Sequence, residues 1–186
     1  MLLRVPLLPW FPHAAAINLA AVVALAACGA SPRPAASAAE SRAEAQQAVA
    51  AVLDDWHDAA ARGDFDRYFA HYDPGGTFLG TDAGEVWDVP AFKDYARVPF
   101  ADGVGWVLVP TRRSLRVAPS GQVAWFEENL ESEGLGPCRG SGVLLRQDGR
   151  WRIAQYNLAL TVPNARLAEV RALLAAAPPL GAGKRR

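Results

Sequence analysis

Apolar residues recur every three or four positions over residues 43–62, whereas the second half of the chain alternates between apolar and polar residues. The first spacing places the recurring side chains on one face of an amphipathic helix. They are Ala45, Ala48, Val49, Val52, Leu53, Trp56 and Ala60. Gly63 is expected to end this helix, because glycine tolerates the backbone conformation that follows a helix.

Two shorter helices and one strand are predicted before residue 106. Asp64 is a suitable N-cap for a short helix that carries Phe65, Tyr68, Phe69 and Tyr72. Residues 73–76, with the sequence Asp-Pro-Gly-Gly, are expected to interrupt regular structure. Residues 77–81 then form a short strand, and residues 89–97 form a third helix.

Four strands and a last helix are predicted in the second half. The strands are expected over residues 106–118, 122–133, 138–147 and 150–162, and the short turns between them make them antiparallel neighbours. The strongest turn signal is Asp148-Gly149. The last helix begins at Asn164 and ends before Pro178 and Pro179.

The strand register predicts which side chains share a face of the sheet. A two-residue turn at Asp148-Gly149 places Ser141 opposite Tyr156. An even-length turn at Ser120-Gly121 places Arg113 opposite Glu128, and one at Leu135-Gly136 places Leu130 opposite Ser141. The face that the helices cover is then mostly apolar. Its apolar members are expected to be Val109, Leu115, Val117, Phe126, Leu130, Val143, Leu145, Ala154 and Leu158. The other face is too apolar to be fully solvated, which favours coverage by a second copy of the chain.

Residues 1–27 have the parts of an export signal that ends at a lipidation site. Arg4 is the only charge, and the apolar run over residues 14–27 is shorter than the roughly 20 residues that span a bilayer. Leu25-Ala26-Ala27-Cys28 resembles the lipobox of bacterial lipoproteins. We expect an acylated Cys28 to hold the protein on a membrane of the cell envelope, outside the cytoplasm. An ordinary signal peptide cleaved near a cysteine is the alternative.

The rest of the chain predicts one domain. Residues 28–42, rich in Ala, Ser and Pro, are expected to be a lipidated tether; residues 43–177 form the domain and residues 178–186 a disordered basic tail. The formal net charge is zero, so no nucleic-acid partner is expected. Neither His-x-x-x-His nor Cys-x-x-Cys occurs, and we expect no metal and no cofactor.

Several ordered segments resemble the SnoaL-like branch of the nuclear transport factor 2-like superfamily. They are residues 78–82 with Glu85 and Trp87, residues 124–128, residues 139–144 and residues 153–158. The resemblance implies an α+β cone in which three N-terminal helices, one C-terminal helix and a curved antiparallel sheet enclose a cavity. It also implies a homodimer formed through the outer face of the sheet. The superfamily includes isomerases, dehydratases, cyclases and members that only bind or assemble.

Arg113 and Glu128 are the leading candidates for holding a polar or anionic ligand at the cavity floor, with Tyr156 as a hydrogen-bond donor. The remaining candidates are Ser141, Arg139, Asp82 and Trp56. A buried ion pair that only fixes strand register is the alternative for Arg113 and Glu128. Because a neighbouring cation lowers the pKa of a carboxyl group, Glu128 is a poor general base, and no catalytic residue is assigned.

The leading functional hypothesis is a lipid-anchored protein that binds a small amphipathic molecule in its cavity. One alternative is an isomerase, dehydratase or cyclase that uses Glu128, Tyr156 or Asp82. Another is a dimeric assembly domain whose cavity is filled. His57 and Asp58 are consecutive on the first helix and point about 100° apart, so they form no catalytic pair.

Overall fold

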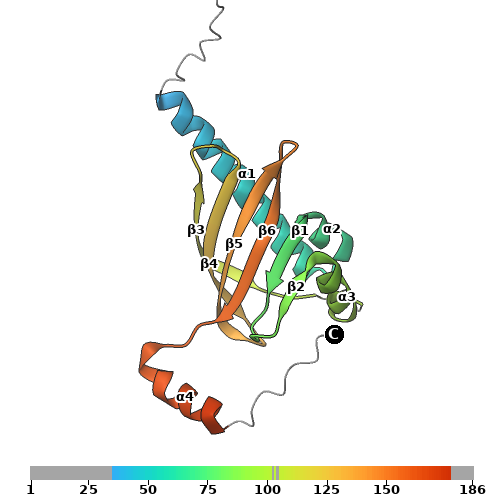
Figure 1. Cartoon of the computed structure of the whole chain (residues 1–186), viewed down its shortest axis with the longest axis vertical. Coiled ribbons are helices and arrows are strands. Elements are labelled where there is room, and N and C mark those ends of the chain that lie inside the picture. Colours follow the sequence, from blue (N-terminus) through green and yellow to red (C-terminus); the bar gives the residue numbers. More distant parts are fainter. Residues whose placement is uncertain (1–34, 102, 104, 177–186) are drawn as a thin grey trace, which may run out of the picture. The chain divides into compact units, whose positions relative to one another are not determined.

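The structure is a computed structural model that describes residues 35–101, 103 and 105–176, with side chains from residue 41 onward (Figure 1). The predicted export signal, Cys28 and the basic tail lie outside the described residues. Among the described helices, none is both long enough and apolar enough to cross a bilayer.

The domain consists of one six-stranded sheet with helices on one side. The helices are α1 (Ala35–Ala61), α2 (Phe65–Ala70), α3 (Val89–Phe100) and α4 (Leu167–Ala176), the last preceded by a 3-10 turn over Asn164–Arg166. The strands are β1 (Tyr72–Leu79), β2 (Val86–Asp88), β3 (Val109–Val117), β4 (Val123–Ser132), β5 (Gly136–Gln147) and β6 (Arg150–Leu160). Their order in the sheet is β2-β1-β6-β5-β4-β3. These elements confirm the predicted α+β architecture and its helix arrangement.

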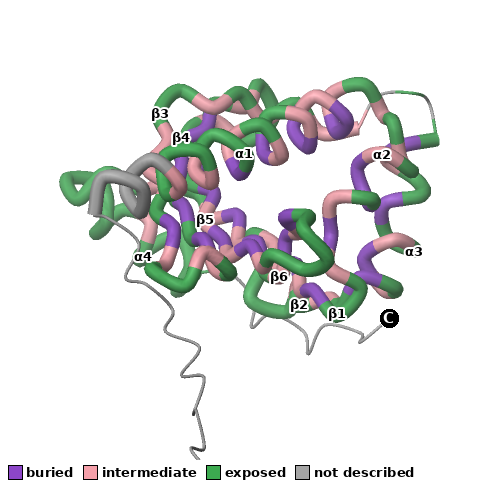
Figure 2. Tube along the Cα trace, turned by 90° about the horizontal axis from the view of Figure 1, so that it is seen from above, coloured by how far each residue is buried: buried purple, intermediate pink, exposed green. Residues whose placement is uncertain are grey.

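The sheet is mixed instead of antiparallel throughout as predicted, because β1 and β6 pair in parallel whereas the other neighbouring strands pair antiparallel. α1 crosses the sheet and contacts β3 and β6, whereas α3 contacts β1 and β2. Figure 2 shows the buried residues on the inner sides of α1, α2, α3 and the sheet, which surround a common interior. α4 buries no residue.

The first helix begins at Ala35, within the segment predicted to be a tether, instead of at residue 43. Residues 35–39 read Ala-Ala-Ser-Ala-Ala, and alanine has the highest intrinsic helix propensity. The second helix is confirmed over Phe65–Ala70, where the Asp64 side chain accepts a hydrogen bond from the Arg67 amide as an N-cap. Tyr72, predicted to belong to this helix, instead begins β1.

Residues 73–76 do not interrupt the chain as predicted but continue β1. A shift in the pairing of β1 with β6, between Tyr72 and Thr77, accommodates them. Gly76 is required there, because an added Cβ atom would lie 2.9 Å from the carbonyl oxygens of both Asp73 and Ile153. The short strand β2 has no counterpart in the sequence prediction.

The predicted register is right for the pairing of β3 with β4 and wrong for the pairing of β4 with β5. Arg113 does lie opposite Glu128. Leu130, however, lies opposite Cys138 and not opposite Ser141, a shift of three residues. The turn holds three residues and is followed by Gly136 with a left-handed φ of 70°. Because the shift is odd, it exchanges the two faces of β5.

The β5–β6 turn forms at Asp148-Gly149 as predicted, but a bulge at Ala154 then changes the pairing by one residue. Tyr156 therefore lies opposite Gly142 instead of Ser141. Trp151 and Ile153, predicted to face outward, are buried in the core together with Tyr156. The expected core positions that are not buried are Val109, Leu115, Val143, Leu145 and Ala154.

Candidate functional site

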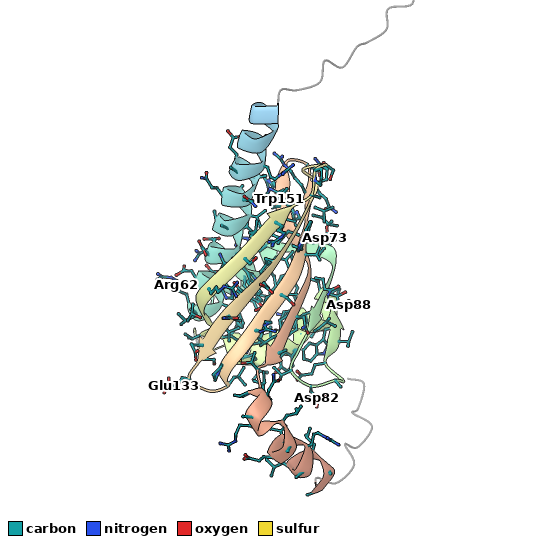
Figure 3. All side chains as sticks on the ribbon, turned by 90° about the vertical axis from the view of Figure 1, so that its left-hand side faces the viewer. Arg62, Asp73, Asp82, Asp88, Glu133 and Trp151 are labelled. Atoms are coloured by element: carbon teal, nitrogen blue, oxygen red, sulfur yellow. The ribbon has the colours of Figure 1, made fainter. Side chains whose placement is uncertain are left out.

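A cavity of about 500 Å³ lies inside the domain, a volume typical of ligand sites. Its floor consists of buried residues: Trp56, His57, Ala60, Tyr68, Phe78, Phe92, Tyr156 and Leu158. Its rim includes the more exposed residues Thr81, Glu85, Tyr95, Val107, Glu133 and Leu135. Figure 3 shows Glu133, one of these rim residues, at the same end of the sheet as Asp82.

Eight aromatic residues line the cavity. Phe92 and Trp106 are nearly parallel, with ring centroids 5.6 Å apart and an interplanar angle of 3°. Trp87 stacks on Tyr95 at 4.7 Å. Trp56 meets the ring of Tyr156 edge-on at 4.6 Å. The wall therefore suits a ligand with an apolar or aromatic body.

His57 is the polar residue at the floor, and a buried carboxylate holds it. Its Nε2 lies 2.7 Å from Oε1 of Glu128, which is only 1% exposed. The second carboxylate oxygen, Oε2, accepts a hydrogen bond of 2.9 Å from Nε of Arg113. Arg113 in turn donates from Nη1 to the exposed Asp54 at 2.7 Å. A series of four charged or titratable groups thus runs from the surface to the cavity floor.

The charges around Glu128 decide its protonation state. Burial favours the neutral acid, but hydrogen bonding and charge from His57 and Arg113 outweigh it and hold the pKa of Glu128 below its ordinary value. Burial likewise opposes ionisation of Arg113, yet Asp54 and Glu128 raise the pKa of Arg113. Glu128 is therefore a carboxylate at neutral pH. It holds a proton on Nε2 of His57, by the assignment that its hydrogen bond implies.

An imidazole that carries its proton on Nε2 alone has a lone pair on Nδ1 that can accept a hydrogen bond. Among the described residues, the side-chain hydrogen bond of His57 is the one between Nε2 and Glu128. A histidine that faces a ligand through one nitrogen and a carboxylate through the other is arranged to accept a proton, since the carboxylate stabilises the imidazolium that results.

Tyr156 places an unused donor beside this pair. Its hydroxyl is buried and has no hydrogen-bond partner among the described residues. The same holds for Nε1 of Trp56. Burial, then the nearby charge of Glu128, raises the pKa of Tyr156 well above its ordinary value, so it remains a phenol. Gly140 makes room for it, because an added Cβ would overlap the hydroxyl and lie 3.0 Å from Oε1 of Glu128.

Of the residues predicted for the site, Arg113, Glu128, Tyr156 and Trp56 lie together. Tyr156 and Trp56 line the cavity, whereas Arg113 and Glu128 stand behind His57 and do not line it. The expectation that Arg113 and Glu128 form the floor is therefore corrected.

The other three predicted residues lie elsewhere. The exchanged faces of β5 place Ser141 and Arg139 on the outer side of the sheet. Asp82 is exposed in the turn between β1 and β2, where Oδ1 accepts a hydrogen bond of 2.7 Å from the amide of Gly84. None of them lines the cavity.

Sequence reasoning considered His57 as a partner of Asp58 and did not place it in the site. The available signal was its position four residues after Leu53 and one after Trp56, which places it on the apolar face of α1. A histidine on such a face needs a buried partner, but the partner lies 71 positions away and depends on how α1 crosses the sheet. Within the described residues, no cluster of three or more His, Cys, Asp or Glu side chains is arranged to hold a metal ion.

The fold and cavity define a cone-like α+β domain of the nuclear transport factor 2-like type. The chain belongs to the SnoaL-like domain family, whose family model matches residues 49–163. Two related solved structures are a nuclear transport factor 2-like protein of unknown function from Pseudomonas putida and a candidate dehydratase of the same family from Streptomyces avermitilis.

The Pseudomonas protein is 14% identical, with a TM-score of 0.57 over 66% of this chain and 90% of that one. The Streptomyces protein is 15% identical, with a TM-score of 0.56 over 65% of this chain and 99% of that one. A protein of unknown function from Mycobacterium tuberculosis is 22% identical, with a TM-score of 0.53 over 66% of this chain and 75% of that one. These likenesses establish the fold. A search among curated proteins gives no match.

Proposed function

We propose that this protein is a lipid-anchored SnoaL-like domain that binds a small amphipathic molecule outside the cytoplasm. The cavity carries this proposal, since its aromatic wall accepts an apolar body and its floor includes the polar side chains of His57 and Tyr156. The Tyr156 hydroxyl is buried and has no hydrogen-bond partner among the described residues. Buried donors without partners are rare in folded proteins, and a ligand that supplies their partners gains affinity.

Calorimetric titration with neutral amphipathic probes, such as 2-naphthol and 4-phenylbutanol, tests ligand binding. Thr81→Trp should weaken it at least ten-fold, because this exposed rim residue would close the cavity without disturbing the core. Gln147→Trp is the matched control, since it places the same side chain at the end of β5 that is far from the rim residues Glu133 and Leu135. Failure of every probe to bind the wild-type protein would exclude the proposal.

The lipobox sequence at Leu25-Ala26-Ala27-Cys28 supports anchoring. Cys28→Ser removes the thiol that would carry the acyl chains, so the variant should leave the membrane fraction after cell disruption. A variant that still sediments with membranes as the wild type does would contradict anchoring through this cysteine.

The His57–Glu128 pair favours a second function, proton transfer on the bound molecule, as in an isomerase or dehydratase. Nδ1 of His57 would take a proton from a C–H group next to a carbonyl, and the Tyr156 hydroxyl would donate to the developing oxyanion. In this second function the proton acceptor is His57, and Glu128, which is a poor general base beside Arg113, orients it.

Exchange of solvent deuterium into a bound ketone, followed by mass spectrometry, separates this function from binding alone. Wild-type protein should catalyse the exchange and His57→Gln should lose it while still binding the ketone. Absence of exchange with every ketone that binds would leave a binding protein. The other alternative, an assembly domain with a filled interior, does not agree with the open cavity.

A further inference from the structure

The ionised side chains that line the cavity are all negative among the described residues. Glu85 and Glu133 belong to the rim, and no lysine or arginine is among the described lining residues. Arg113, the cation nearest the floor, stands behind His57 and is already paired with Asp54 and Glu128. The cavity therefore offers no charge that would attract an anion, contrary to the expected role of Arg113 as an anion holder.

Glu85 and Glu133 have no ion-pair partner among the described residues, as is the case for most carboxylates of the domain. Asp55, Asp58, Asp94, Glu128 and Glu169, by contrast, each lie within ion-pair distance of an arginine. Glu85 is also held in place: Oε2 accepts a hydrogen bond of 3.2 Å from the amide of Asp82, and its side chain lies against Gly80. An ordered, unpaired carboxylate at a cavity rim attracts a cation.

Aromatic rings line the same cavity as these carboxylates. Trp87, Tyr95 and Trp106 line the same cavity and are more exposed than the floor residues. Tyr95 stacks with Trp87 at 4.7 Å and with Trp106 at 6.3 Å, with interplanar angles of 22° and 14°. Aromatic faces attract organic cations through the ring quadrupole, and tryptophan does so most strongly.

The floor gives independent evidence of a ligand and indicates how it lies. Tyr156 lines the cavity, and its hydroxyl is buried against Gly140 with no hydrogen-bond partner among the described residues. A ligand oxygen that reaches this hydroxyl would accept a hydrogen bond from it. Nδ1 of His57 can accept from the same group if that group is a hydroxyl. An uncharged hydroxyl at the floor and a positive charge at the rim would satisfy both ends of the cavity.

We infer that the cavity takes an organic cation: an amine or quaternary ammonium group on an aromatic or apolar body that ends in a hydroxyl. This inference rests on the proposed function, because it names the class of molecule that the same cavity binds. The ammonium group lies at the rim between Glu85, Glu133 and the aromatic faces, and the hydroxyl reaches Tyr156 and His57.

Three probes that share one body test the charge preference on the full-length protein by calorimetric titration. The cation is 2-(4-hydroxyphenyl)ethyl-trimethylammonium. The neutral isostere is 4-(3,3-dimethylbutyl)phenol, in which carbon replaces nitrogen, and the anion is 3-(4-hydroxyphenyl)propionate. The cation should bind at least ten-fold more tightly than the anion, and at least as tightly as the neutral isostere although it is more strongly hydrated.

The double variant Glu85→Gln/Glu133→Gln should reduce the ratio of cation to anion affinity at least five-fold. Glu127→Gln is the matched control, because it removes the same charge from an exposed residue on the outer side of the sheet. The single variants Glu85→Gln and Glu133→Gln are measured beside it. If Glu127→Gln lowered the ratio of cation to anion affinity as much as either of them does, the preference would come from net charge and the inference would be wrong.

The outcomes separate this inference from the proposed function. If the neutral probe binds and the cation binds no better than the anion, the cavity binds ligands without the preference, and only the inference fails. If none of the three probes binds, both fail.

Discussion

At the residue scale, Glu128 is the group on which the polar interior depends. It is a buried carboxylate that contacts His57 and Arg113, so a neutral replacement leaves Arg113 with less compensation inside the protein. Removing one partner of a buried pair costs about 3–5 kcal/mol. We expect Glu128→Gln to lower the free energy of unfolding by an amount of that order at neutral pH, measured by urea denaturation.

The pH dependence of the same variant identifies the charge as the cause. The pKa of folded Glu128 lies below 4.5, the ordinary value, so its contribution is present above pH 4.5 and is lost as the pH falls through the folded pKa. Wild-type stability should therefore decline more steeply than that of Glu128→Gln below about pH 4.5. Parallel profiles would show that the carboxylate is not preferentially ionised in the folded state.

Gly140 illustrates how a missing side chain shapes the site. A Cβ at this position would overlap the Tyr156 hydroxyl, and overpacking of this kind typically costs about 1–3 kcal/mol. Gly140→Ala should therefore destabilise the protein, and adding Tyr156→Phe should restore part of the loss because it removes the overlapped atom. Thermal unfolding of the two single variants and the double variant measures this coupling. Additive losses would contradict the overlap.

Tyr156→Phe alone separates folding from binding. The hydroxyl makes no hydrogen bond among the described residues, so its removal should leave stability within about 1 kcal/mol of the wild type. It should nevertheless weaken binding of a phenolic probe about five-fold or more, because the ligand loses a donor. Calorimetric titration and thermal unfolding of one preparation test both parts, and unchanged affinity would remove Tyr156 from the site.

At the element scale, local pattern was enough to predict most of the fold. Period-two alternation and the Asp148-Gly149 turn gave the four strands from β3 to β6, and helical spacing gave α1 to α3. The β3–β4 register, with Arg113 opposite Glu128, was also predictable because both strands are regular near their turn. The resemblance of four ordered segments to SnoaL-like domains supplied the architecture that local pattern alone does not fix.

The faces of β5 and β6 were not predictable, and the reason is specific. A turn of three residues instead of an even number exchanged the faces of β5, and a bulge at Ala154 shifted β6. Both features add or remove one residue from a pattern of period two, and an apolar sequence on both faces conceals the change. The His57–Glu128 contact was hidden for another reason, since it depends on helix docking.

The bulge at Ala154 gives a prediction at this scale. Deleting Ala154 would restore the plain alternation with Trp151, Ile153, Tyr156 and Leu158 all still on the inner face, because Ala154 is the extra residue between the two pairs. We therefore expect the deletion variant to keep a cooperative thermal transition, followed by circular dichroism. Ala154→Ser is the control because it keeps the extra residue. Loss of the cooperative transition in the deletion variant would show that the fold requires the bulge itself.

At the scale of the whole molecule, the outer face of the sheet is the surface on which a proposed homodimer would form. Trp125 lies there, 44% exposed and paired in register with Arg116, and both border a hollow that Ser141 and Glu127 also line. Burying this tryptophan against a second copy would remove apolar area from water. We therefore expect the wild-type protein to sediment as a dimer.

Trp125→Glu should shift that equilibrium to the monomer, by at least ten-fold in dissociation constant, because a carboxylate at the centre of an interface must be desolvated without a partner. Sedimentation velocity over a concentration series measures the shift. Val98→Glu is the control, since Val98 is 79% exposed and belongs to α3 rather than to the sheet. A monomeric wild type, or an equal shift in both variants, would leave the outer face without a role in assembly.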